Sequence, residues 1–328
     1  MTQNADTMKA AVTGQAGLEI RDVPRPRPKP HDVLVRVRVA DLNRADLAGA
    51  AHHGTASPIF IPGLDWAGDV AEIGPDVKGI NIGDRVMCSG TGGYAEYAVS
   101  DWGRVLPVPK AMSYEQAATL PVALLTMHDA LMSNGRLKRG EAVLIQGASS
   151  GVGLMALQIA KHMGARLVIG SSTNPARRER LKDFGADLAI DTGQPQWVEQ
   201  VLQATGGKGV DLVVDQVSGK LANQTMQATA ILGRIVNVGR LGGAKAEFDF
   251  NLHALRRIDY VGVTFRTRSV EEVREISRRM RADLWPAIEA GKFALPIDRS
   301  FPLADAEKAQ AHMRANAHFG KILLKVAD

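Results

Sequence analysis

A glycine-rich turn stands near the middle of the chain, directly after an apolar run. Residues 143–153 read VLIQGASSGVG, and an amphipathic helical pattern follows over residues 154–161. Glycines let the backbone turn tightly, and free N–H groups at the start of a helix attract anions. A strand before the turn and a helix after it are the context that this motif requires. The stretch therefore predicts a dinucleotide site rather than only a tight structural turn. Its predicted diphosphate contacts are Gly147, Ala148, Ser149, Ser150, Gly151 and Val152.

Alternating strand and helix patterns extend from this turn to about residue 264. The strand patterns begin at residue 143 and recur at residues 166–170, 188–191, 210–215, 234–239 and 258–264. Asn174 and Pro175 supply an N-cap and a first-turn proline for one intervening helix, and Gly185 ends that helix. Strands that alternate with helices predict a doubly wound parallel sheet of the α/β class.

The segments on either side of this sheet have different patterns. Short apolar runs bounded by glycine and proline predict a turn-rich β domain over about the first 120 residues. Ser113 and Gln116 form a capping-box pattern, which begins a helical stretch to about residue 134. Residues 270–290 predict an amphipathic helix that Pro286 could kink or break, and residues 321–326 predict a strand that returns to the first domain.

The composition limits the classes of function. The chain has 328 residues, enough for two domains, with the 45% apolar and 23% charged content of a globular protein. Its net charge of +5 comes from scattered basic residues, which disfavours nucleic-acid binding. The single cysteine, Cys88, excludes an internal disulfide and a cysteine-based zinc site. No apolar run approaches the ~18 residues of a membrane span. The polar first seven residues do not resemble a signal peptide, so we expect a cytoplasmic protein.

Short segments along nearly the whole chain match one family in order and spacing. They are residues 43–46 (NRAD), 62–68 (PGLDWAG), 83–86 (GDRV), 93–97 (GYAEY), 143–153, 184–187 (FGAD), 233–236 (GRIV) and 320–322 (GKI). Together they resemble the medium-chain dehydrogenase/reductase superfamily, in its zinc-independent quinone oxidoreductase branch. The resemblance implies a Rossmann doubly wound sheet at residues 125–264, inserted in a GroES-like β-rich domain at residues 1–124 and 265–328.

The alcohol dehydrogenases of this superfamily bind a catalytic zinc that this chain is not expected to hold. Where that branch has a cysteine and a Gly-His-Glu segment, the matching positions here carry Asp41 and Leu64, with Asp65 beyond. A Lewis-acid route that polarises an alcohol needs those ligands. His52 and His53 lie in a glycine/alanine-rich loop without a spaced partner, and we interpret them as surface histidines.

The end of the second strand bears on the choice of nicotinamide cofactor. An NAD-selective site usually has a carboxylate there, which binds the ribose 2′-hydroxyl. Residues 170–174 read GSSTN instead, and no acid occurs before Glu179. Hydroxyl and guanidinium groups attract a 2′-phosphate, so we expect NADP(H), although Arg177 and Arg178 could also form a solvated arginine face. Thr192 stands where related reductases often have a tyrosine. The predicted contacts at this end are Ser171, Ser172, Asn174 and Arg177.

The resemblance also implies the position of the nicotinamide ring and of the acceptor. Asn43 would position the nicotinamide or the acceptor carbonyl, and Asp46 would orient Asn43 or a water molecule. Capping of a short helix is an equal alternative for both residues. Thr126 matches a position near the nicotinamide. The predicted contacts of the carboxamide edge are Val238, Gly239 and Arg240.

Hydride transfer from a nicotinamide requires the protein mainly to hold the acceptor and to exclude water. The predicted function is NADPH-dependent reduction of a quinone or related conjugated carbonyl without zinc. The alternatives are reduction of an enoyl or other activated double bond, and a nucleotide-binding redox sensor without turnover. A short-chain dehydrogenase is excluded, because none of the four tyrosines has a lysine four residues later. The family also implies a homodimer, paired through a strand at residues 259–265.

Overall fold

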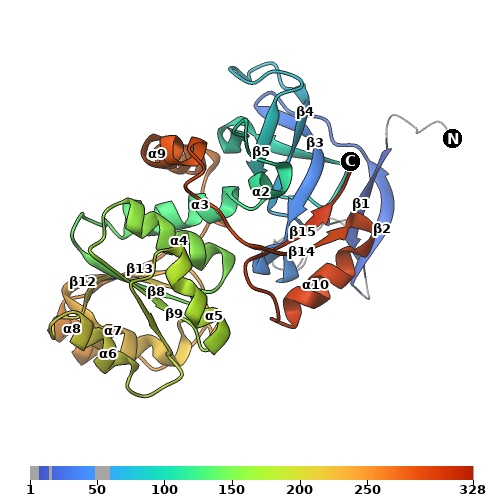
Figure 1. Ribbon diagram of the computed structural model, residues 1–328. Coiled ribbons are helices and arrows are strands. Elements are labelled where there is room, and N and C mark those ends of the chain that lie inside the picture. Colours follow the sequence, from blue (N-terminus) through green and yellow to red (C-terminus); the bar gives the residue numbers. More distant parts are fainter. Residues whose placement is uncertain (1–6, 15–16, 49–59, 328) are drawn as a thin grey trace. The chain divides into compact units, whose positions relative to one another are not determined.

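The structure is a computed structural model that describes residues 7–14, 17–48 and 60–327 (Figure 1). The chain divides into two compact units. The first comprises Met1–Val122 and Arg268–Asp328, and the second is the continuous segment Ala123–Thr267. These limits lie two or three residues from the domain limits 124/125 and 264/265 expected from the sequence.

The first unit is built on a seven-stranded sheet with the order β14-β15-β3-β4-β5-β7, and β6 also pairs with β3. Its strands are β3 (Asp32–Asp41), β4 (Asp65–Ile73), β5 (Arg85–Ser89), β6 (Tyr97–Asp101), β7 (Val105–Pro107), β14 (Ile297–Pro302) and β15 (Lys321–Lys325). A separate antiparallel pair consists of β1 (Thr7–Thr13) and β2 (Leu18–Pro24). β15 pairs antiparallel with β3, which confirms that the last strand returns to the first domain.

Two helices of the first unit begin where the sequence signals place them. The predicted capping box is present at the start of α2 (Tyr114–Ala118), where Ser113 and Gln116 exchange both hydrogen bonds. α9 (Val270–Glu289) continues through Pro286, so a break there is excluded, and a kink stays a prediction. The remaining helical segments among the described residues of this unit are η1 (Arg44–Ala48), η2 (Trp102–Arg104), η6 (Leu303–Asp305) and α10 (Ala306–Arg314).

The second unit contains the predicted parallel sheet, with six strands in the order β10-β9-β8-β11-β12-β13. They are β8 (Ala142–Gln146), β9 (Leu167–Ser171), β10 (Leu188–Ile190), β11 (Val210–Asp215), β12 (Thr229–Asn237) and β13 (Asp259–Gly262). Every neighbouring pair is parallel. The strand order reverses between β8 and β11, and ligands of such sheets bind beyond the carboxyl ends of the strands at this switch point.

Helices cover this sheet, and some of them begin at side-chain caps. α4 packs on β8 and β9, whereas α7 packs against α6 and α8 (Figure 1). Asn174 caps α5 with Pro175 at its start, and Gly185 ends the following turn at a φ of 101°, as predicted. The helical segments are α3 (Pro121–His128), η3 (Asp129–Asn134), α4 (Gly151–His162), α5 (Pro175–Glu179), η4 (Arg180–Phe184), α6 (Trp197–Ala204), η5 (Gly219–Leu221), α7 (Ala222–Ala228) and α8 (Phe250–Arg256). Within the described ranges, no helix is both long and apolar enough to span a membrane.

Candidate functional site

The turn between β8 and α4 brings two parts of the backbone very close together. Gly147 has a φ of 69°, which residues with a side chain rarely adopt. A Cβ atom on Gly153 would lie 2.6 Å from the carbonyl oxygen of Gly147, so only glycine fits there. Ser150 caps α4, because its hydroxyl oxygen accepts a hydrogen bond from the N–H of Gly153 at 3.0 Å.

The backbone N–H groups of this turn indicate a site for an anion. The N–H groups of Gly147 and Ala148 donate to the hydroxyl and carbonyl oxygens of Ser171, at 3.1 and 2.9 Å. Within the described part of the chain, three further N–H groups have no acceptor. They are those of Ser149, Gly151 and Val152. Unpaired donors at the start of a helix suit a phosphate, so this cradle fits the diphosphate of a dinucleotide.

Substitution of Gly153 by Ala tests the close approach in this cradle. The added Cβ would also lie 2.7 Å from the Cα of Ala148, so the turn must open. We expect strain on the order of 1–3 kcal/mol and roughly tenfold weaker NADPH binding. Melting temperature and a fluorescence titration with NADPH measure the two effects. Gly262→Ala is the control, because a Cβ there meets no atom within 4 Å. Equal losses in the two variants would contradict the prediction.

The end of β9 places hydroxyl groups beside the cradle. The hydroxyl of Ser172 donates to that of Ser149 at 3.1 Å, and Ser171 accepts from Gly147 as described above. Asn174 lies in the same segment, where its side chain caps α5 by accepting from the N–H of Arg177 at 3.0 Å. The structure thus joins Ser171 and Ser172 to the glycine turn. The roles of Asn174 and Arg177 toward a 2′-phosphate stay predictions.

An acid that the sequence did not single out lies near these hydroxyl groups. Asp191 follows β10 and pairs with the guanidinium of Arg178 at 3.0 Å. Arg178 also donates to the carbonyl oxygen of Ser172 at 2.9 Å. Arg178 therefore ties the end of β9 to the end of β10. The sequence could not show this, because the pairing depends on the two strands lying side by side.

The loop after β12, predicted to hold the carboxamide edge, is fixed to the end of β11. Ser218 has φ 56° and ψ −143°, a strained backbone conformation for a residue with a side chain. Its N–H donates to the carboxylate of Asp215 at 2.8 Å, and its hydroxyl donates to the carbonyl oxygen of Gly239 at 2.9 Å. Asn237 in turn donates to the Ser218 hydroxyl. Burial raises the pKa of Asp215. A pocket of about 230 Å³ beside this network is lined in part by Arg240.

In the first unit, Asn43 lies within a cluster of charged side chains that are all at most 8% exposed. Its amide nitrogen donates to Asp65 at 2.9 Å, and its amide oxygen accepts from the ammonium of Lys321 at 3.2 Å. Its backbone N–H donates to Asp46 at 2.8 Å. Lys321 also forms an ion pair with Asp41. We call these five residues, Asp41, Asn43, Asp46, Asp65 and Lys321, the buried charged cluster.

Asp46 and Asn43 have different parts in this cluster. Asp46 accepts from the N–H groups of Asn43 and Gly63 and, at 2.9 Å, from the hydroxyl of Tyr94. It therefore holds the backbone N–H of Asn43, the residue just before η1. The side chain of Asn43 faces Asp65 and Lys321 instead. Burial raises the pKa of Asp46 to about 7 and, despite the nearby Lys321, that of Asp65 to about 6.

The cluster also bears on the question of a metal ion. Asp65 already accepts from Asn43 and from the N–H of Val122, at 2.9 and 2.8 Å, and Asp41 pairs with Lys321. A buried ammonium is thus already the cationic partner of the carboxylates that a divalent cation would otherwise need as ligands. Among the residues described, no group of three His, Cys, Asp or Glu side chains could hold a metal. His52 and His53 lie outside the described residues.

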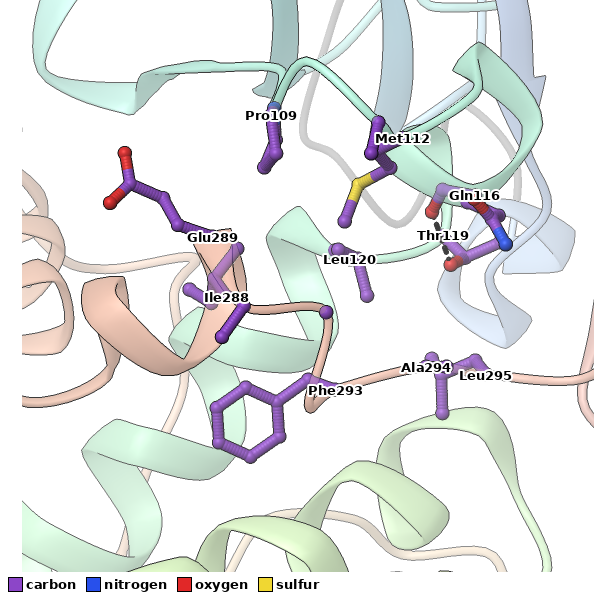
Figure 2. A pocket seen from close by; sticks show the side chains of 13 residues that line it. Pro109, Met112, Gln116, Thr119, Leu120, Ile288, Glu289, Phe293, Ala294 and Leu295 are labelled. Atoms are coloured by element: carbon purple, nitrogen blue, oxygen red, sulfur yellow. Dashed lines mark hydrogen bonds between the residues drawn. The ribbon is translucent and has the colours of Figure 1, made fainter.

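Thr126 and an apolar pocket lie apart from the residues described above. Thr126 lies on α3 in the second unit and is partly exposed, and its role stays a prediction. A pocket of about 220 Å³ in the first unit lies between residues 109–120 and the end of α9 (Figure 2). Met112, Leu120 and Phe293 are among the apolar side chains that surround it in that view. None of the predicted site residues lines this pocket.

Comparison with known proteins identifies relatives over nearly the whole chain. Residues 29–110 match the alcohol dehydrogenase GroES-like domain, and residues 151–282 match the zinc-binding dehydrogenase model. The quinone oxidoreductase of Rattus norvegicus is 29% identical over 311 residues, which cover 92% of each chain. A phenolphthiocerol/phthiocerol polyketide synthase subunit of Mycobacterium tuberculosis is 30% identical over 94% of this chain, which spans only 14% of that protein's length.

Solved structures agree with these matches. A probable oxidoreductase from Mycobacterium abscessus is 31% identical with a TM-score of 0.83, covering 98% of this chain and 99% of that one. A mycobacterial protein complexed with NADPH is 26% identical with a TM-score of 0.86, covering 97% and 100%. The two-unit fold, the glycine cradle and these likenesses together show that the chain belongs to the medium-chain dehydrogenase/reductase superfamily and is quinone oxidoreductase-like.

Proposed function

We propose that this chain binds NADP(H) and reduces a quinone or a related conjugated carbonyl by hydride transfer, without a metal ion. The observation that carries the proposal is the cradle at the start of α4, where three N–H groups have no acceptor among the described residues. The likeness to a mycobacterial protein complexed with NADPH supports the cofactor. The likeness to the rat quinone oxidoreductase supports the acceptor.

Different segments of the second unit bind different parts of the dinucleotide. The N–H groups of Ser149, Gly151 and Val152 hold the diphosphate, and the hydroxyl groups at the end of β9 face the ribose. The loop of residues 238–240 receives the carboxamide edge. Bound NADPH supplies the hydride, and the protein orients the ring and excludes water. A quinone needs no strong general acid, because solvent can protonate the hydroquinone oxygen.

The buried charged cluster supports a reaction without a metal ion. The ammonium of Lys321 lies against Asp41 and within 4.0 Å of Asp65, so these carboxylates already have a cationic partner. A zinc ion in the same place would have to displace that buried ammonium. The residues present therefore do not fit the zinc site that the name of the matching dehydrogenase model implies.

The test is oxidation of NADPH by the purified chain with a panel of quinones, enones and simple alcohols, with and without a chelator. We expect turnover of quinones that the chelator leaves unchanged. Turnover of enones alone would replace the acceptor by an activated double bond. NADPH binding without any turnover would favour a redox sensor, and loss of activity with the chelator would overturn the metal-free mechanism.

Substitution of Arg177 by Ala tests the preference for NADPH. A guanidinium that contacts the 2′-phosphate contributes on the order of 1–3 kcal/mol, so NADPH binding should weaken roughly tenfold. NADH lacks this phosphate, and its affinity should not change. Titrations with both cofactors measure the ratio. The control is Lys182→Ala, which removes an exposed cation from the neighbouring turn. Equal weakening toward NADPH and NADH would show that Arg177 does not bind the 2′-phosphate.

We also propose that two copies pair through β13. This strand is one edge of the six-stranded sheet. Exposed apolar side chains accompany it on neighbouring elements, with Phe250 77% and Leu255 68% exposed on α8. Light scattering should give twice the mass of one chain, and a double variant with Glu at both positions should give a monomer. A monomeric wild-type chain would refute the dimer. The cytoplasmic location expected from the sequence stays a prediction.

A further inference from the structure

One buried side chain contacts the glycine turn from the neighbouring strand. Gln216 directly follows β11 and is 3% exposed. Its amide nitrogen donates to the carbonyl oxygens of Gln146 and Gly147, at 3.0 and 3.4 Å. Its amide oxygen accepts from the hydroxyl of Ser150 at 2.9 Å. The side chain thus spans the base of the cradle.

The chemistry of these partners fixes the orientation of the Gln216 amide. Two backbone carbonyl oxygens can only accept hydrogen bonds, so the nitrogen end must face them and the oxygen end must face Ser150. The Ser150 hydroxyl, which also lies 3.0 Å from the carbonyl oxygen of Gly147, accepts in turn from the N–H of Gly153. Gln216 is therefore connected through Ser150 to the first turn of α4.

The backbone of the same residue contacts the second loop of the proposed site. The N–H of Leu241 donates to the carbonyl oxygen of Gln216 at 3.2 Å. A Cβ on Gly239 would lie 2.6 Å from that oxygen and 3.1 Å from the Cα of Gln216, so the loop packs directly on this residue. Gln216 consequently contacts both the turn for the diphosphate and the loop for the carboxamide edge.

We propose that Gln216 is a positioning residue that holds the glycine turn and the loop of residues 238–241 in one fixed geometry. Each loop receives a different end of the dinucleotide, so their separation must match the length of the bound molecule. If this separation is already fixed before NADP(H) binds, binding does not have to order the two loops, and the entropy lost on binding is smaller. The inference rests on the NADP(H) binding proposed above, although it does not depend on which acceptor is reduced.

Gln216→Met tests the inference because it keeps the side-chain volume and removes both hydrogen-bonding ends. The matched control is Gln146→Met. Gln146 is fully buried on the adjacent strand β8, but its amide nitrogen donates to Thr225 at 2.8 Å rather than to the glycine turn. Fluorescence titration should show NADPH binding about tenfold weaker in Gln216→Met and within about twofold of wild type in Gln146→Met. Melting temperatures should fall similarly in both.

Two outcomes would overturn the role of Gln216. One is an NADPH affinity of Gln216→Met equal to that of wild type. The other is an equal loss of NADPH affinity in Gln146→Met, which would mean that replacing any buried glutamine near the turn weakens binding. If Gln216→Met does not fold, Gln216→Leu removes the same hydrogen bonds with a shorter side chain, with the same expected loss and the same contradiction. A wild-type chain that binds no NADPH would defeat the proposed function itself, whereas failure to reduce quinones would leave this inference standing.

A double-substitution cycle separates a shared contact from two independent ones. Ser150 and Gln216 act through one hydrogen bond, so Ser150→Ala combined with Gln216→Met should weaken NADPH binding by less than the product of the single effects. If the losses of NADPH affinity in the two single variants multiply, the hydrogen bond between these side chains does not contribute to NADPH binding. The Michaelis constant for NADPH should rise in parallel with the dissociation constant.

Discussion

Replacement of Lys321 by Met is expected to lower the free energy of unfolding by about 3–5 kcal/mol, as when one partner of a buried ion pair is removed. The ammonium of Lys321 is the cation that contacts Asp41 and Asn43 and lies 4.0 Å from Asp65. Without it, two buried carboxylates remain with no counter-charge. Urea denaturation at neutral pH measures the loss.

Two further variants show whether charge is the cause. Lys325→Met alters the same strand, but that side chain is 58% exposed, and the change should stay within about 0.5 kcal/mol. Adding Asp41→Asn to Lys321→Met removes one of the uncompensated charges and should recover part of the lost stability. If Lys321→Met is no more destabilising than Lys325→Met, the ion pair does not stabilise the fold.

Stability is also expected to fall as the pH rises from about 4 to about 7, owing to the buried carboxyl groups. Burial raises the pKa of Asp46 to about 7 and that of Asp65 to about 6, whereas an unfolded aspartate titrates near pH ~3.9. In this window the folded chain binds more protons than the unfolded chain, so the unfolding free energy decreases with pH. The stability that these two carboxyl groups contribute is fully present below the pKa of an unfolded aspartate. It is lost as the pH rises past their folded pKa values of about 6 and about 7.

Asp46→Asn isolates the larger of these effects. A pKa raised by about three units corresponds to about 4 kcal/mol between acid and neutral pH. Asn cannot titrate. The difference in unfolding free energy between wild type and Asp46→Asn should therefore change by about 4 kcal/mol between about pH 4 and about pH 7. Denaturant melts in steps from about pH 4 to pH 8 would measure it. Asp183→Asn, on the exposed side of η4, is the control for the loss of a surface carboxylate, and an unchanged slope in Asp46→Asn would contradict the prediction.

The sequence predicted best those features whose causes are local. The capping box at Ser113 and the cap at Asn174 each act within four residues, and the structure contains both. The glycine turn is local in the same sense, because Gly147 and Gly153 are needed by the backbone around them. Pro286 marks the limit of such rules, since α9 continues past it.

The missed residues act across long separations in the chain. Lys321 and Asn43 are 278 positions apart, and a lysine at the start of a strand is usually exposed. Only the pairing of β15 with β3 brings its ammonium to Asp41. Gln216 belongs to no motif, and its role depends on β11 lying beside β8. Such contacts follow from the topology, which a single sequence does not display.

The discontinuous first unit has a consequence for the order of events on the ribosome. Translation finishes residues 123–267 before it reaches β15, so the second unit can assemble while the first still lacks the strand between β14 and β3. Until Lys321 emerges, the nascent chain also lacks the cation for Asp41 and Asp65. The sheet of the first unit therefore stays incomplete until β15 has emerged, although residues 7–122 are synthesised before the second unit.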